Sequence, residues 1–123
     1  MGDNKGYIKK ADNRGSVNIS EEVIAIIAAS AAAEVSGVYG LSTAPGREIT
    51  QKLGRRGSAK GVKISVEDED VVIDIQIMVE MGTPINEVGS EIQNVVKSAV
   101  ETAVGLTVKA VNVHVCGIAL KKN

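Results

Sequence analysis

The chain has 123 residues, 44% of them hydrophobic, and its formal net charge at pH 7 is −1. This length suits a single domain with its own core, and the nearly neutral charge excludes a global attraction to nucleic acid or to an anionic membrane. Cys116 is the one cysteine, which excludes an internal disulfide and fits a reducing compartment. Phe and Trp are absent, so the base-stacking platforms of single-strand nucleic-acid binders are not expected.

The two ends of the chain are polar. Residues 1–14 are rich in charge, Gly and Asn and contain no apolar signal-peptide core, so we expect a flexible N-terminal arm. Residues 15–118 are expected to form a single domain, followed by a C-terminal tail over 119–123. The longest apolar-rich run, Val23 to Val35, is too short to span a bilayer. These features predict a soluble, cytoplasmic protein.

The first elements of the domain are a short strand and a helix. Residues 15–20 alternate in polarity, and Ser20 is a good N-cap for a helix over 21–35 whose first turn is acidic. The apolar residues of this helix go nearly all the way round, which predicts burial on most sides. Its alanine-rich stretch also favours close contact with another helix. Residues 37–42 are predicted to be extended, and residues 43–60 form a loop with several Pro and Gly breakers.

The second half of the chain predicts a hairpin, a helix and a last strand. Residues 61–67 and 71–80 alternate in polarity around an acidic turn, with Val62, Ile64 and Val66 predicted to point inward. Thr83 as N-cap, with Pro84 at the first helical position, predicts the start of a second helix, which ends at Gly105. Residues 106–118 alternate with a change of parity near Ala110, which predicts a β-bulge. The order β-α-β-β-α-β predicts an α+β two-layer sandwich, with two helices packed on one face of a small mixed or antiparallel sheet.

Charge is segregated along the chain. Six cations lie between residues 47 and 63, and no Lys or Arg follows until Lys97. This layout predicts a basic pole and an acidic pole that match charges on a protein partner or on another copy. The predicted contact residues are Arg47, Lys52, Arg55, Arg56, Lys60, Asp68, Glu69 and Asp70.

The basic loop also spells a possible nucleic-acid motif. Gly54-Arg55-Arg56-Gly57 matches the G-x-x-G loop with which KH domains clamp a nucleic-acid backbone. In such domains a helix follows the motif at once, whereas here residues 58–66 lead directly into a strand. Nucleic acid is therefore not the expected partner, and a nucleic-acid-binding regulator that uses this loop stays as the alternative function.

Residues suited to catalysis are few. His114 and Cys116 are two apart on the last predicted strand, so their side chains are expected to share a face. A thiol nucleophile would need a third orienting group, and a metal site would need further ligands. The sequence predicts no enzyme activity, no cofactor and no metal site.

Several short stretches, taken together in their order and spacing, resemble a known family. They are G-x-V-x-I-S-x-E-V-I-A at 15–25, K-G-V at 60–62, I-D-I-x-I at 73–77, G-T-P-I-x-E-V at 82–88 and G-L-x-V-x-x-V-N-V-x-V-x-G-I at 105–118. These stretches resemble the alkaline-shock-protein family of envelope stress response proteins from Gram-positive bacteria. The resemblance covers residues 15–118 and is to the compact members of the family.

The resemblance implies a non-enzymatic cytoplasmic protein. Some members of that family are held at the membrane by a separate integral-membrane anchor protein, and others are linked to the control of fatty-acid synthesis. We therefore expect a self-associating interaction module with a membrane-anchored or metabolic protein partner, located in the cytoplasm and peripherally at the membrane through that partner. The family provides no catalytic residues to carry over.

Overall fold

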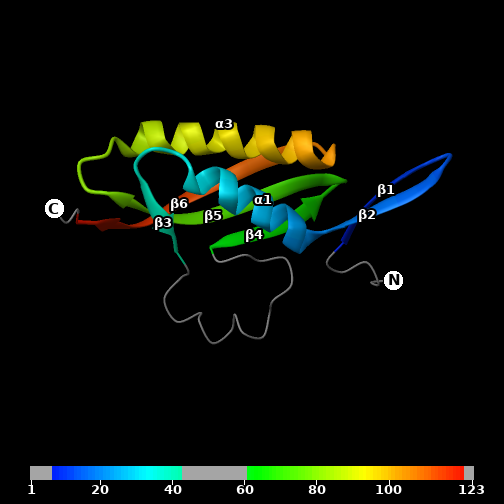
Figure 1. Ribbon diagram of the computed structural model, residues 1–123, viewed down its shortest axis with the longest axis horizontal. Helices are drawn as coiled ribbons and strands as arrows, with labels where there is room; N and C mark the ends of the chain where they lie inside the picture. The colour runs from blue at the N-terminus through cyan, green and yellow to red at the C-terminus, as the bar shows by residue number, and fades with distance from the viewer. Residues whose placement is uncertain (1–6, 43–60, 121–123) are drawn as a thin grey trace, which may run out of the picture.

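The computed structural model describes residues 7–42 and 61–120 (Figure 1). Two helices lie on one side of a four-stranded sheet, and a separate two-stranded hairpin extends from one end of the body. The elements, in chain order, are β1 (Tyr7–Asp12), β2 (Gly15–Ser20), α1 (Glu21–Ala33), β3 (Val38–Leu41), β4 (Val62–Glu67), β5 (Asp70–Glu80), α3 (Ile85–Val104) and β6 (Val108–Ala119). The predicted fold class, an α+β sandwich of two helices on a mixed sheet, is confirmed.

Strand β5 is the centre of the sheet. Strand β6 runs parallel to β5 along its whole length, from Val71 to Glu80. Because a strand has only two edges, β3 and β4 share the other edge, where β4 pairs antiparallel with residues 70–75 and β3 with residues 77–79. The two strands meet at Gln76, whose N–H donates to the carbonyl of Gly61 and whose carbonyl accepts from the N–H of Ser42, both at 2.8 Å.

The core lies between the sheet and the two helices. Every second residue of β5, from Val71 to Val79, is at most 1% exposed, as the alternation of the sequence predicts. Helix α3 covers this face with Val88, Ile92, Val96 and Val100, and α1 adds Ile24 and three buried alanines. The two helices also pack against each other, so the predicted helix–helix contact is confirmed.

The caps explain where the helices begin and end. Ser20 Oγ accepts a hydrogen bond from the N–H of Val23 at 3.1 Å, as predicted. Gly105 ends α3 in the left-handed conformation, with φ of 73°, also as predicted. The predicted N-cap at Thr83 is wrong, because Pro84 occupies that position and the Thr83 N–H instead donates to the carbonyl of Glu80 at 3.1 Å.

Three features differ from the prediction. Residues 7–12, expected within the N-terminal arm, form β1 and pair with β2 from Tyr7↔Ser20 to Asp12↔Gly15. Helix α1 is not buried on most sides, because the sheet and α3 cover only one side of it and leave Val23 46% and Ile26 51% exposed. Val66 was predicted to point into the core and is 42% exposed, because it lies near the end of β4, beside the turn.

Strand β6 contains two bulges. Val71 pairs with Val108 and Val72 with Ala110, so Lys109 is the extra residue and the predicted bulge near Ala110 is confirmed. A second bulge was not predicted. Ile77 pairs with Val115 and Met78 with Gly117, so Cys116 is the extra residue there.

Candidate interaction surfaces

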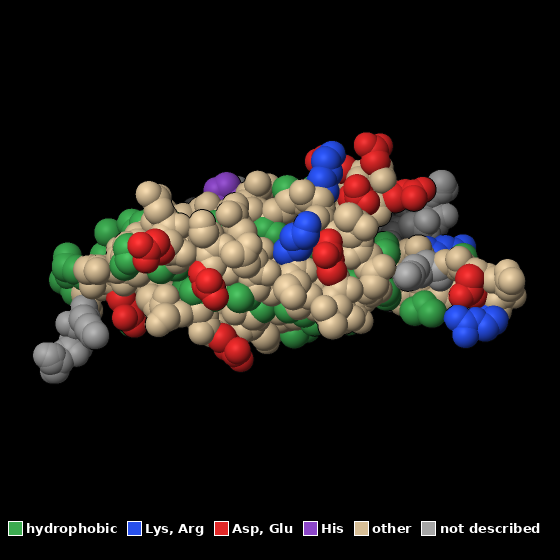
Figure 2. All heavy atoms as spheres, turned by 90° about the horizontal axis from the view of Figure 1, so that it is seen from above, with side chains coloured by type: hydrophobic (Ala, Val, Ile, Leu, Met, Phe, Trp, Pro, Cys, Tyr) green, Lys and Arg blue, Asp and Glu red, His purple; other side chains and the backbone are tan. Residues whose placement is uncertain are grey.

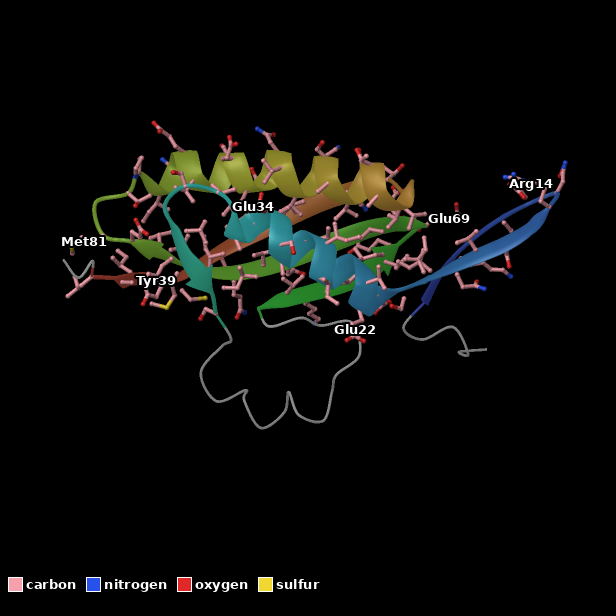
Figure 3. All side chains as sticks on the ribbon, viewed as in Figure 1. Arg14, Glu22, Glu34, Tyr39, Glu69 and Met81 are labelled. Carbon is pink, nitrogen blue, oxygen red and sulfur yellow. The ribbon has the colours of Figure 1, made fainter. Side chains whose placement is uncertain are left out.

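The turn between β4 and β5 presents three of the predicted contact residues. Glu67 pairs with Asp70, so Asp68 and Glu69 form a two-residue hairpin loop. Their φ angles are 52° and 75°, which is the type I′ geometry that favours Asn-Gly. Both side chains are exposed, and Glu69 lies at the tip of the hairpin (Figure 3). We call Asp68, Glu69 and Asp70 the acidic turn.

The ion pairs of the described residues leave the acidic turn out. Lys109 Nζ lies 3.2 Å from Glu67 Oε1, the nearest carboxylate before the turn. The other pairs with a Lys or Arg join Arg14 to Asp12 and Lys97 to Glu101. Among the described residues, no ion pair includes a carboxylate of the acidic turn.

The predicted basic residues lie outside the described residues. Arg47, Lys52, Arg55, Arg56 and Lys60 fall within residues 43–60, so their part in a contact stays a prediction. The residues that flank this segment are described. Ser42 and Gly61 both form backbone hydrogen bonds with Gln76. Gln76 is six positions along β5 from Asp70, which corresponds to roughly 20 Å. The segment thus joins the sheet at one end of β4, and the acidic turn lies at the other.

The open face of the sheet holds His114 and Cys116. Asn112 Nδ2 donates to Asp74 Oδ1 at 2.9 Å, and His114 Nε2 lies 3.6 Å from the same oxygen. Cys116 Sγ contacts the carbonyl of His114 at 3.7 Å. Both side chains are exposed, and Cys116 is the extra residue of the second bulge.

The sequence reasoning did not place Asp74 beside His114. The two residues are 40 positions apart and become neighbours only through the β5–β6 register, which pairs Asp74 with Asn112 and Gln76 with His114. The outward position of Asp74 in the alternation of β5 was the only local signal. The His114 and Asp74 side chains are 54% and 34% exposed, so this group is an open network that links two strands.

An open groove separates the C-terminal end of α1 from the first half of α3. Its apolar lining includes Ala31, Val35, Val88 and Val95, and its acidic lining consists of Glu34, Glu80, Glu87 and Glu91. Figure 2, which looks down on the helices, shows red acidic side chains along this side of the molecule. We call the four glutamates the groove acids.

Hydrophobic side chains remain exposed at the end of the sheet where β5 and β6 finish. Met81 is 54% exposed, Ile118 50% and Leu120 70%. The N–H of Met81 donates to the carbonyl of Ala119 at 2.9 Å, which holds the ends of the two strands together. Figure 2 shows green side chains gathered at one end, and Figure 3 places Met81 at the end opposite Glu69 and Arg14.

Within residues 7–42 and 61–120, no group of three or more His, Cys, Asp or Glu side chains is arranged to hold a metal ion. In the same residues, neither helix is both long and apolar enough to cross a membrane.

The fold and these open surfaces define a small two-layer α+β domain. Residues 9–120 match the profile of the alkaline shock protein 23 family, described as having a cell envelope-related function. The chain belongs to this family, which confirms the resemblance seen in the sequence.

Two curated relatives come from Gram-positive bacteria. The uncharacterized protein YloU of Bacillus subtilis is 36% identical over 106 residues, which is 85% of this chain and 88% of YloU. The uncharacterized protein Spy1614 of Streptococcus pyogenes is 34% identical over 106 residues, with the same coverage of each chain. Among solved structures, the copper form of the MamM CTD is similar at a TM-score of 0.47 and 17% identity, covering 82% of this chain and 86% of that one.

Proposed function

We propose that the chain is a non-enzymatic interaction module that self-associates and docks on a protein partner. The partner is membrane-anchored or metabolic, and the context is the cell envelope or lipid synthesis. The family's cell envelope-related description supports this context. The module works in the cytoplasm and reaches the membrane through its partner.

The acidic turn is the observation that carries this proposal. A non-glycine residue in the left-handed region costs about 1–2 kcal/mol, and this turn holds two in succession, with φ of 52° and 75°. Asn-Gly would close the same hairpin with less strain. Asp is a preferred residue at the first position of such a turn, but stability does not explain Glu69 at the second position, whereas recognition of a cationic surface does.

The two segments that flank β4 in the sequence carry charges of opposite sign. The acidic turn lies at one end, and the segment that carries Arg47, Lys52, Arg55, Arg56 and Lys60 joins the sheet at the other. A partner with the complementary arrangement is held at two points, which fixes its orientation as well as its affinity. A partner whose charges all have one sign would match only the acidic turn or only the basic segment.

In-cell photo-cross-linking tests the proposal. A photoreactive phenylalanine analogue replaces Glu69 in one chain and Glu22, an exposed acid of α1, in the control. We expect a discrete cross-linked protein from position 69 and not from position 22. Its yield should fall when Asp68 and Asp70 are also changed to Lys. The same product from both positions, or none from position 69, contradicts the proposal.

A titration with labelled RNA and DNA at physiological salt tests the alternative. The interaction-module proposal expects no saturable binding, because the net charge is −1 and the acidic turn repels phosphate. Saturable binding that Arg55→Glu and Arg56→Glu abolish would instead support a nucleic-acid-binding regulator.

A further inference from the structure

The side of β6 that faces away from β5 is protected only in its first half. The N–H of Val108 donates to Glu101 Oε2 at 2.8 Å, and Gln93 Nε2 donates to the carbonyl of Val111 at 3.1 Å. Both partners are side chains of α3, and the charged Lys109 lies between the two capped positions. Charged residues and side chains that cover the backbone are the usual means of keeping an edge strand from pairing.

The second half of β6 has no such protection. From Val113 to Ala119, no strand and no side chain of another described element bonds to this side of the strand. Residues 110–120 contain no Asp, Glu, Lys or Arg. Val115 and Ile118, whose partners in β5 belong to the buried face, are 37% and 50% exposed. An added extended strand would pair with this edge and cover both side chains.

The β1–β2 hairpin is the other incomplete part of the structure. Ile8 is 8% exposed and packs into the core together with Ile19, which roots the hairpin beside α1. Beyond this root, residues 11–18 are all exposed, and Val17 is 62% exposed. An isolated two-stranded hairpin is marginally stable in water, and a third strand removes that weakness. From here on, the arm means this hairpin, residues 7–20, and not the flexible segment expected over residues 1–14.

We infer that the arm of one copy adds as extra strands to the second half of β6 in another copy. This inference rests on the proposed role as an interaction module, but it uses surfaces separate from the acidic turn. The charges match. The arm contains three cations, Lys9, Lys10 and Arg14, and one acid, Asp12. Its net charge is therefore three minus one, or +2. Glu80, opposite Ala119 in the register, and Glu87 in the first turn of α3 lie at the end of the body where β6 finishes (Figure 1).

The geometry makes the contact head to tail. The arm extends from one end of the long axis, and β6 finishes at the other end (Figure 1). The arm therefore serves a second copy, whose own arm is then available to a third.

Cross-linking between Val17→Cys and the native Cys116 tests this contact. Cys116 is exposed within the receiving half of β6 and is the only cysteine of the chain. A short bismaleimide should convert the Val17→Cys chain into a ladder of trimers and larger species, because each copy then has a thiol at both ends. The control chains are Val17→Cys with Cys116→Ser, and Thr102→Cys, which adds an exposed thiol elsewhere. Neither control should exceed dimers.

The same experiment has outcomes that overturn the inference. If the Val17→Cys chain gives no more trimers than the Thr102→Cys chain, the arm does not meet β6. If the unaltered chain forms dimers through Cys116 as readily as the Val17→Cys chain forms its products, β6 pairs with β6 instead.

Mixing two blocked variants distinguishes the contact from the docking function. Lys9→Glu with Lys10→Glu disables the arm, and Val115→Lys with Ile118→Lys disables the edge. Each variant alone should assemble about tenfold more weakly than the unaltered chain, while an equimolar mixture should form a heterodimer in sedimentation velocity. Thermal melts check that both variants are folded. No heterodimer from folded variants contradicts the inference.

A chain with Asp68, Glu69 and Asp70 changed to Lys separates the two proposals. If only the arm contact is correct, this chain still assembles normally, and the chain with the photoreactive residue at position 69 gives no partner cross-link. If only the docking function is correct, the partner cross-link is present and the bismaleimide ladder is absent.

Discussion

Asp68 and Glu69 occupy consecutive left-handed positions in the turn that joins β4 to β5, with φ of 52° and 75°. A residue with a Cβ adopts this conformation at a cost, and glycine adopts it freely. Changing Glu69 to Gly should therefore raise the free energy of unfolding by about 1 kcal/mol. Urea denaturation followed by circular dichroism measures the change. Glu69→Gln is the matched control, because it removes the charge and keeps the strain. An equal gain in both variants would mean that charge, and not backbone conformation, limits the stability of the turn.

Gly61 is required where β3 and β4 meet on β5. Its φ is +81°, and a Cβ there would lie 2.7 Å from the carbonyl oxygen of Ser42. We expect Gly61→Ala to lower the free energy of unfolding by about 2 kcal/mol or more. Gly89→Ala in α3 is the control, since nothing lies within 4 Å of its Cβ and alanine favours a helix. The control should gain about 0.5–1 kcal/mol. Losses of similar size in both variants would contradict the described junction.

The buried face of β5 should dominate stability. Ile75 is 0% exposed and Val66 is 42% exposed, although the sequence pattern predicts both to be inward. Ile75→Ala should cost about 2–5 kcal/mol through lost burial and a cavity, whereas Val66→Ala should cost well under half of that. Thermal unfolding of the two variants measures the difference. Similar costs would mean that Val66 is covered, by the rest of the chain or by another copy.

Glu101 should stabilise the start of β6. Its Oε2 accepts from the N–H of Val108 at 2.8 Å, and Val108 is 1% exposed. Glu101→Ala removes a charge-assisted hydrogen bond to a buried backbone group, so we expect a loss of about 1.5–3 kcal/mol. Glu91→Ala is the control on the same helix. Hydrogen exchange at the Val108 amide should accelerate in the Glu101 variant alone, and equal protection in both variants would contradict this role.

Cys116 should behave as an ordinary exposed thiol. Its Sγ contacts only the carbonyl of His114 among the hydrogen bonds of the described residues, at 3.7 Å. Because a carbonyl contact does not activate a thiol, iodoacetamide should label Cys116 no faster than it labels glutathione at the same pH. His114→Ala should leave the rate unchanged. Labelling that is much faster than that of glutathione, and that depends on His114, would support thiol chemistry and contradict a non-enzymatic role.

The sequence predicts the elements better than it predicts their neighbours. The alternation of β5 identifies its buried face, and the parity change near Ala110 identifies the bulge at Lys109, because both are local patterns of side-chain direction. The bulge at Cys116 escapes this reasoning. Small and apolar residues surround it, so the pattern there fits either parity.

Contacts between distant segments could not be predicted from local patterns. Nothing in residues 7–12 indicates pairing with β2, and nothing in β3 or β4 indicates that both use the same edge of β5. The position of Asp74 beside His114 depends on the β5–β6 register in the same way. Of the candidate contact residues, the acidic turn follows from the hairpin pattern, while its strained φ angles become apparent only in the structure.

Binding of the cross-linked partner, once isolated, tests the central claim most directly. Its dissociation constant with the unaltered chain and with the Asp68→Lys, Glu69→Lys and Asp70→Lys chain is measured at low and at high salt. We predict binding at least about tenfold weaker for the altered chain at low salt, and a smaller difference at high salt, because salt screens charges on an exposed surface. Equal dissociation constants for the two chains at both salt concentrations would contradict recognition through the acidic turn.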